Sequence, residues 1–208
     1  MLTVEKSRVM NIDGAIRGAR NPMNSWDRSD SYYNENGEFV LGPADIDLGR
    51  RLARAGSDHR KFLRQIFVSV DILAPLYWWK EFDTYKVGTV ANSTSTMHKI
   101  HAKPFSRSDF SCERMSDDAL KVLDVIIDFL ESERNKFNEN KEDRTHWHNI
   151  IQLLPSSYNQ LRTVTMNYEN LINIYSARKN HKLKEWHVFC DWIESLPYSE
   201  DFIQLKKD

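Results

Sequence analysis

The chain has 208 residues, of which 40% are hydrophobic and 12% aromatic, a composition typical of a globular protein with a substantial core. Its formal net charge of -1 and the lack of a basic block argue against charge-driven binding to nucleic acid or to a membrane surface. Small molecules or further copies of the same chain are the expected partners. We predict a single domain over residues 1–208.

The cysteine content and the N-terminal sequence indicate the compartment. Cys112 and Cys190 are the only cysteines and no CxxC pair occurs, so neither a disulfide framework nor a thiolate metal site is predicted. The first residues are too polar for a signal peptide, and no apolar run approaches the roughly 18 residues of a membrane span. We therefore expect reduced thiols and a cytoplasmic location.

The N-terminal part alternates between predicted strands and helices. Apolar residues in 2–12 fit a strand, and a short helix is expected over 15–20. Residues 21–42 form a polar stretch that we predict to be a flexible loop. A helix should begin at Pro43 and end at Gly56, and the β-rich run IFVSVDIL predicts a buried strand.

The segment 74–99 concentrates aromatic, amide and hydroxyl groups. Pro75 suits a helix N-terminus, and Gly88 ends the regular part before the hydroxyl-rich loop 92–96. Flat apolar area comes from Trp78, Trp79, Phe82 and Tyr85. The loop can offer hydroxyl and backbone donors to an anionic or polyol ligand, which predicts a binding site. An amphipathic helix followed by an ordinary solvated loop is the alternative.

The C-terminal part is predicted to be helical. Residues 115–137 carry apolar side chains on one face and charged ones on the other, which is typical of an amphipathic core helix. A charged break over 136–144 precedes helices expected at 146–154, 156–178 and 183–196. On the long helix 156–178, Asn167, Asn173 and Arg178 could border one cleft.

Several common chemistries lack sequence support. Two pairs of closely spaced histidines occur, at 98 and 101 and at 146 and 148, but neither has a carboxylate at a recognised metal spacing such as HExxH. We expect no metal site. No GxSxG, Walker A or GxGxxG motif is present, so a nucleophile elbow and a phosphate-binding glycine loop are not predicted.

From about Gly42 to Trp192 the chain resembles the flavin-dependent thymidylate synthases. In that family a strand with an Ala-Pro dipeptide leads into a helix and a motif RHRxxSxNExSxRY. Here VDILAPLYWWKEFDTYKVGTVANSTSTMH occupies the same place with about one extra residue, and Asn92 and Ser95 match the motif's Asn and second Ser. The family's later Leu-Pro dipeptide and long helix resemble LLPSSYNQLRTVTMNYENLINIYSAR, which supplies Pro155, Asn167, Asn173 and Arg178.

The chain departs from this pattern at charged positions. The RHR triplet falls on Thr84, Tyr85 and Lys86, and the motif's Glu becomes Ser93. The closing Arg-Tyr becomes Met97 and His98, an upstream arginine becomes Ile151, and a family histidine becomes Gln65, which keeps hydrogen bonding without proton transfer. Because neither Met nor Ile replaces a guanidinium on phosphate, Lys86, His98 or Lys99 takes over this role or dUMP is no longer the ligand.

The resemblance implies a fold, an activity and an assembly. The expected fold is α+β, with a central sheet flanked by several helices, as in the thymidylate synthase complementing proteins, and the chains would form a homotetramer. The activity would be that of a flavin-dependent methyltransferase in nucleotide biosynthesis. It would move a one-carbon unit from methylenetetrahydrofolate to C5 of dUMP, with FAD, reduced by NADPH, delivering a hydride.

The resemblance also implies site residues. Arg178 and Ser95 would be catalytic, and Arg178 would orient the pyrimidine and stabilise the negative charge that develops on its ring. The FAD site would be lined by Thr84, Tyr85, Lys86, Asn92, Asn167, Asn173 and Gln65. The nucleotide would be contacted by Glu81, Ser93, Ser95, Met97 and Arg178.

Two alternatives stay open at this point. One is a relative that modifies a different pyrimidine nucleotide, because the changes at Ser93, Met97 and Ile151 would retune specificity more than fold. The other is a catalytically silent oligomer without flavin, which keeps the fold for nucleotide binding or for a structural role.

Overall fold

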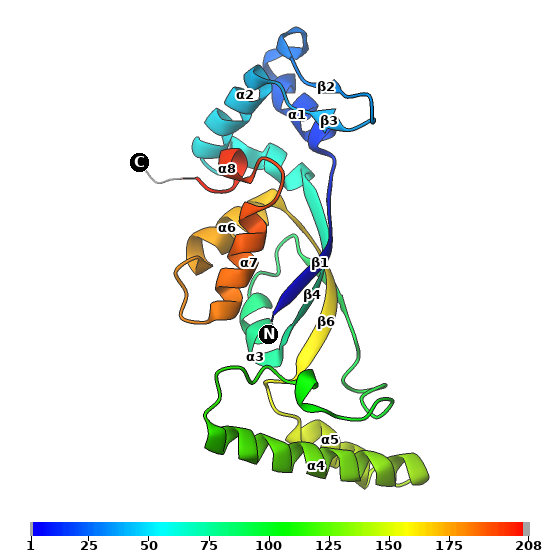
Figure 1. The fold of residues 1–208 in the computed structure, drawn as a ribbon. Helices are drawn as coiled ribbons and strands as arrows, with labels where there is room; N and C mark the ends of the chain where they lie inside the picture. Colours follow the sequence, from blue (N-terminus) through cyan, green and yellow to red (C-terminus); the bar gives the residue numbers. More distant parts are fainter. Residues whose placement is uncertain (1, 206–208) are drawn as a thin grey trace. The chain divides into compact units, whose positions relative to one another are not determined.

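The fold is α+β, with one four-stranded sheet and one small hairpin, in a computed structural model that describes residues 2–205 (Figure 1). The four-stranded sheet has the strand order β1-β4-β6-β5, and β2 pairs antiparallel with β3. The strands are β1 (Thr3–Met10), β2 (Tyr32–Tyr33), β3 (Phe39–Val40), β4 (Phe67–Pro75), β5 (Val90–Ser93) and β6 (Asn159–Asn167).

Helices alternate with these strands along the chain. The α-helices are α1 (Ile12–Arg20), α2 (Pro43–Arg54), α3 (Leu76–Phe82), α4 (Asp117–Glu139), α5 (Thr145–Leu153), α6 (Tyr168–Arg178), α7 (Lys184–Glu194) and α8 (Ser199–Phe202). Short 3₁₀ helices are η1 (Asn21–Met23), η2 (Trp26–Arg28), η3 (Arg60–Gln65) and η4 (Arg107–Asp109). Within residues 2–205, no helix combines the length and the apolar character that crossing a bilayer requires.

The chain divides into two compact units, each assembled from separate stretches. Of the described residues, the first contains 2–3, 72–84 and 92–163, and the second contains 4–71, 85–91 and 164–205. Strands β4 and β6 contribute residues to both units.

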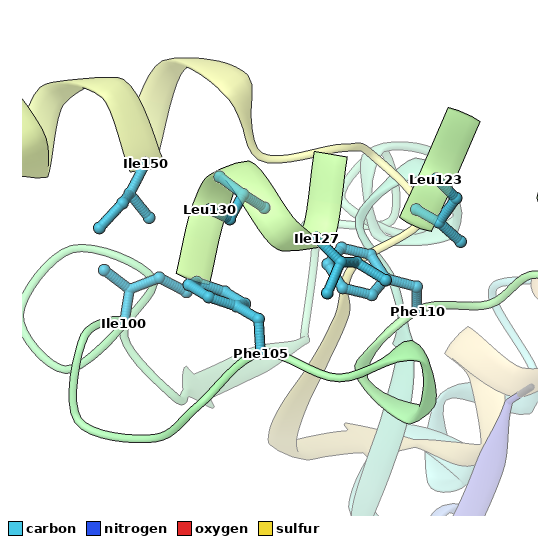
Figure 2. Close-up of a cluster of buried hydrophobic side chains, with 7 residues drawn as sticks. All are labelled: Ile100, Phe105, Phe110, Leu123, Ile127, Leu130 and Ile150. Atoms are coloured by element: carbon cyan, nitrogen blue, oxygen red, sulfur yellow. The ribbon is translucent and has the colours of Figure 1, made fainter. Parts of the chain in front are cut away.

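The first unit is built around the pair of helices α4 and α5. Their apolar faces and the loop before α4 form a core cluster, of which Figure 2 shows the buried members Ile100, Phe105, Phe110, Leu123, Ile127, Leu130 and Ile150. Helix α4 begins where the hydroxyl of Ser116 accepts a hydrogen bond from the amide of Ala119, an ordinary N-cap. In the same unit Trp78, Trp79 and Phe82 of α3 are buried and pack on one another.

The second unit packs α1, α2 and η3 together, and α6 against α7. Its largest fully buried side chains include Tyr168, Trp186, Phe189 and Phe202. Strand β4 enters this unit as Phe67–Asp71, where buried Val68 and Val70 alternate with more exposed neighbours as expected for a strand. The core of this unit therefore combines aliphatic side chains with several large aromatic ones.

The prediction of one long helix over residues 156–178 is wrong. Residues 156–178 do not form one long helix; they form strand β6 followed by helix α6. The strand is marked by alternation, since Val164 and Met166 are buried and Thr163 and Thr165 are exposed. In addition, part of the predicted loop 92–96 belongs to strand β5, and the predicted loop 21–42 contains η1, η2 and the β2–β3 hairpin.

Candidate functional site

The loop Tyr85–Gly88 lies on the first turn of α6. Its backbone is held there by Asn170, whose Nδ2 donates to the carbonyl oxygen of Val87 at 2.6 Å. Gly88 has a φ of 77°, and a Cβ added to it would lie 3.0 Å from Nδ2 of Asn167. The left-handed backbone and the close approach both require glycine at this position. The loop is therefore ordered by the side chains of α6.

Asn167 begins α6 rather than standing on its surface. Its Oδ1 accepts from the amide of Asn170 at 3.0 Å, and Oδ1 of Asn170 accepts from the amide of Asn167 at 3.1 Å. This reciprocal capping box satisfies two amides that a helix N-terminus otherwise leaves unpaired. Asn167 itself is only 8% exposed, and the two capping hydrogen bonds are partly buried.

Arg178 and Tyr85 lie together beside a buried tryptophan. The Nε of Arg178 donates to the hydroxyl of Tyr85 at 2.8 Å. Its guanidinium carbon lies 4.7 Å from the ring centroid of Trp186 and 5.6 Å from that of Tyr85. Cation–π contact and the hydrogen bond thus hold the guanidinium in one orientation. An arginine fixed in this way is preorganised to bind an anionic or electron-rich ligand.

The other predicted flavin contacts of this unit occupy different places. Lys86 is exposed in the loop, and Asn173 is exposed on α6. Gln65 ends η3, and its Oε1 lies 3.0 Å from where a Cβ on Gly18 of α1 would be, so its side chain faces α1. The structure brings Tyr85 and Arg178 into contact and sets Asn167 against the loop, while Gln65 points elsewhere.

Two arginines of η3 fix this helix to α6. Arg60 Nε donates to Glu169 Oε1 at 3.1 Å, and Arg64 also pairs with the Glu169 carboxylate. The hydrogen bond from Arg64 is the main reason why the pKa of Glu169 is lowered from its usual 4.5. Because Glu169 stands in the first turn of α6, its charge also complements the helix dipole.

In the first unit, Ser95 shapes the turn that carries Met97. Its Oγ accepts from the amide of Met97 at 3.1 Å and from the amide of His98 at 2.9 Å. The carbonyl oxygen of Met97 accepts from Nε1 of Trp147 on α5 at 2.9 Å. Met97 remains 43% exposed. Ser95 therefore acts as a local cap that presents an exposed apolar side chain.

The buried Gln160 of β6 connects the turn to β6 in the same unit. Its Nε2 donates to the carbonyl oxygen of Thr94 at 2.8 Å, and its Oε1 accepts from Nε of Arg162 at 3.0 Å. The backbone oxygen of Gln160 accepts from Nε1 of Trp79. Arg162 also lies over the Trp79 ring at 4.2 Å and pairs with Asp83 at 2.7 Å. These contacts join the turn, α3 and β6.

The remaining predicted residues lie at the surface of the first unit. The hydroxyl of Thr84 donates to the carbonyl oxygen of Glu81 at 2.7 Å, just beyond the end of α3. Glu81 is half-buried on α3, and Asn92 and Ser93 are exposed on β5. Within residues 2–205 no group of three or more His, Cys, Asp or Glu side chains is placed to hold a metal ion.

Sequence reasoning missed Asn170, Trp186 and Gln160. A signal for Asn170 was available, because Asn-x-x-Asn before an apolar run is close to the pattern of a capping box. Gln160 was assigned to a helix, which hid the strand that positions it. The contact of Trp186 with Arg178 depends on tertiary packing and has no local signal.

The comparisons with known proteins give the fold class. No family model matches the sequence, and no curated protein matches it significantly. Among solved structures, thymidylate synthase X (ThyX) from Helicobacter pylori with FAD and dUMP aligns with a TM-score of 0.71 at 16% identity, covering 98% of this chain and 97% of that one. A second structure of the H. pylori flavin-dependent enzyme, also with FAD and dUMP, has a TM-score of 0.68 and 16% identity over 99% of both chains.

A further match is a UMP/dUMP methylase, PolB, from Streptomyces cacaoi bound with 5-Br dUMP. Its TM-score is 0.63 at 15% identity, over 98% of this chain and 95% of that one. The alignments extend over nearly the whole of each chain. The protein therefore has the α+β fold of the flavin-dependent thymidylate synthases, and the fold expected from the sequence is confirmed.

Proposed function

We propose that the protein is a divergent FAD-dependent thymidylate synthase of the cytoplasm. It would transfer a one-carbon unit from methylenetetrahydrofolate to C5 of dUMP and reduce it, giving dTMP, with NADPH as the reductant. The fold supports this proposal, because matching structures with FAD and dUMP align along nearly the full chain.

The observation that carries the proposal is the contact between the loop Tyr85–Gly88 and the helices α6 and α7. The resemblance assigns Tyr85 to the active site through the motif and Arg178 through the later helix, although the two residues are 93 positions apart in the chain. They are hydrogen-bonded to each other beside Trp186. Independent assignments that meet in one place support a site there.

The residues of this unit fit a flavin. The exposed Lys86 supplies a cation for a pyrophosphate, the Tyr85 ring supplies flat area, and Asn173 offers both a donor and an acceptor. Asn167 would act mainly by holding the start of α6, because its side chain is engaged in the capping box. When bound, FAD would supply the hydride that reduces the transferred carbon.

Arg178 would bind and orient the pyrimidine. Its hydrogen bond to Tyr85 and its stacking on Trp186 hold the guanidinium before any ligand arrives. A preorganised cation stabilises negative charge on the ring without reorganisation at the moment of reaction. Ser95 would contribute through the shape of the turn that it caps, which carries the exposed Met97.

Flavin retention by a matched pair of variants tests the assignment. Asn173 and Ser176 are both exposed on α6, so neither Asn173→Ala nor Ser176→Ala should disturb folding. After incubation with FAD and removal of the excess, the Asn173→Ala variant should retain less flavin than the wild type, and the Ser176→Ala variant should retain as much. Equal retention by all three proteins would refute the role of Asn173.

A second candidate is a methylase for another pyrimidine nucleotide. Met97 stands where the resemblance places an arginine, and one of the matching structures is described as a UMP/dUMP methylase. The rates of turnover of UMP and of dUMP, each measured with methylenetetrahydrofolate, NADPH and FAD, distinguish the two candidate functions. Preference for dUMP supports thymidylate synthesis, whereas preference for UMP supports the second candidate.

Self-association as a homotetramer is part of the proposal. Val122, Val125 and Phe129 of α4 are 60%, 68% and 41% exposed, at a spacing that places them on one face of the helix. We expect light scattering to give a tetramer for the wild type and smaller species for Val125→Asp. A tetramer that binds no flavin would instead support the silent structural oligomer.

A further inference from the structure

An aromatic pocket in the second unit lies outside the residues assigned above. It has a volume of about 480 Å³ and lies between α1, η2 and the β2–β3 hairpin. The residues that matter for its chemistry are Asp13, Ile16, Arg17, Trp26, Tyr33 and Phe39. A volume of this size accommodates a small organic molecule.

The aromatic side chains of this pocket are fixed at their polar ends. Nε1 of Trp26 donates to Oδ1 of Asn21 at 2.9 Å, and the hydroxyl of Tyr33 donates to Asp13 at 2.8 Å. Phe39 supports Tyr33, with 5.1 Å between the ring centroids. Nevertheless, Trp26 and Tyr33 remain 51% and 60% exposed. Exposed rings held in one orientation offer their faces to a flat ligand at low entropic cost.

A buried carboxylate anchors the segment that carries these rings. Asp45 is fully buried; its Oδ1 accepts from Nε of Arg20 at 2.6 Å, and its Oδ2 accepts from the hydroxyl of Ser29 at 2.6 Å and of Ser31 at 2.5 Å. A buried charge is costly unless it is fully paired, as this one is. The segment 25–33 is therefore tied to α1 and α2 instead of moving freely, and the pocket is preformed.

Arg17 supplies the cation of the pocket. Its side chain is exposed on α1, and among the described residues none forms a hydrogen bond or an ion pair with it. Arg20 differs, because it forms a direct, buried ion pair with Asp45, whereas Arg17 only attracts the nearby Asp13 carboxylate through space. The carboxylate of Asp13 is engaged by Tyr33. A planar guanidinium beside aromatic faces favours a ligand that combines a ring with a carboxylate or phosphate group.

We propose that this pocket binds a flat aromatic molecule that bears an anionic group, with its ring against Trp26 and Tyr33 and its anion on Arg17. The proposal is independent of flavin and of thymidylate synthesis, because none of these residues belongs to the assigned site. It would stand if the protein bound no flavin, and it could fail in an active thymidylate synthase.

Binding of small probes to the full chain tests this proposal. The probes are 4-aminobenzoate and phenyl phosphate, with benzamide as their uncharged counterpart, measured by ligand-observed NMR. At least one anion should bind more tightly than benzamide, and the anion that binds better tells whether carboxylate or phosphate is preferred. The Trp26→Ala variant should weaken that binding about tenfold, and Arg17→Gln should abolish the preference for the anion.

Matched controls are available on the same elements. Tyr32 is 58% exposed and Arg28 is exposed, and neither lines the pocket, so Tyr32→Ala and Arg28→Gln should bind the probes as the wild type does. The proposal is overturned if neither anion binds more tightly than benzamide, or if the control variants lose as much binding as the pocket variants. Circular dichroism of each variant confirms that the fold is kept.

Discussion

The loop Tyr85–Gly88 and the turn Thr94–His98 both carry residues of the same sequence motif, but they are held in different ways. The loop depends on side chains of α6, chiefly Asn170, and its Tyr85 on Arg178. The turn is shaped by its own Ser95 and is joined to its unit by Gln160. The loop should therefore respond to distant substitutions, whereas the turn should respond to local ones.

The largest expected effect is at the aromatic support of the loop. Trp186 is fully buried beneath Arg178, so Trp186→Ala should lower the free energy of unfolding by about 3–5 kcal/mol. Hydrogen exchange should rise more at 85–90 than at 94–99. Val188 is 41% exposed on the same helix, and Val188→Ala should change the free energy of unfolding by less than about 0.5 kcal/mol in urea titrations.

A buried charge in the unit of the turn gives the next effect. Glu133 is 3% exposed and accepts hydrogen bonds from Lys136, Asn149 and His146, which lower its pKa to about 2. Glu133→Gln should lower the free energy of unfolding by about 2–3 kcal/mol at pH 7, as measured by urea titration. It should also loosen α5, whose Trp147 donates a hydrogen bond to the turn. Glu139→Gln, at an exposed position of α4, is the control.

The same carboxylate gives a pH dependence of known sign. Its folded pKa of about 2 lies below the ordinary value of 4.5, so its stabilisation is complete above pH 4.5 and is lost as the pH falls toward 2. The difference in free energy of unfolding between the wild type and Glu133→Gln should therefore shrink over this range. A difference that stays constant from pH 7 to pH 3 would contradict this assignment.

The third prediction concerns the connection of the turn to β6. Gln160→Leu keeps the size of the side chain but leaves the carbonyl of Thr94 and Nε of Arg162 without their partner. We expect the free energy of unfolding to fall by about 1–2 kcal/mol. Hydrogen exchange should become faster at 94–99 and stay unchanged at 85–90. Gln152→Leu, at an exposed position of α5, should be neutral. Faster exchange in both segments would mean that the two are not held separately.

The fourth prediction concerns the loop Tyr85–Gly88 instead of the turn Thr94–His98. Asn170→Ala removes the acceptor of the Asn167 amide, which is one half of the capping box of α6, and the hydrogen bond to Val87, and should lower the free energy of unfolding by about 1 kcal/mol. Exchange should increase at 85–90 and stay unchanged at 94–99. Asn173→Ala on the same helix serves as the control for stability, since its side chain is exposed.

The smallest expected effect is at Ser95. Ser95→Ala removes an acceptor for two amides in an exposed turn, and should cost about 0.5 kcal/mol because water can replace the hydroxyl. The rate of nucleotide turnover should nevertheless fall, because the resemblance assigns Met97 of this turn to the nucleotide site. Ser93→Ala, on exposed β5, is the matched control for stability; unchanged turnover in Ser95→Ala would show that the shape of the turn does not matter.

The sequence predicted most regular elements because their periodicity is unambiguous. Strand β4 was expected from its run of β-branched and aromatic residues and α4 from its one long apolar face, and both are confirmed. Strand β6 was missed because Leu161, Val164 and Tyr168 also fit helical spacing, so the spacing of apolar residues does not distinguish a strand from a helix here. The burial of Gln160 and the exposure of Leu161 are consistent only with the strand, and both result from tertiary packing.

The site could be predicted only in part for a similar reason. The resemblance named Tyr85 and Arg178, and they are in contact, but their support by Trp186 comes from another helix. Asn167 was named as a flavin contact, and its capping role follows from a helix start that the sequence reasoning placed elsewhere. Motif positions thus indicate where a site lies, while the residues that hold it depend on the fold.

The most direct test of the central claim is an absorption spectrum of the protein after incubation with FAD and removal of the excess. Flavin chemistry supplies the whole proposed reaction, so bound flavin should give bands near ~370 and ~450 nm. Those bands, reduced in Asn173→Ala and kept in Ser176→Ala, are the predicted result. Wild-type protein that retains no flavin would contradict the proposal of a flavin-dependent thymidylate synthase.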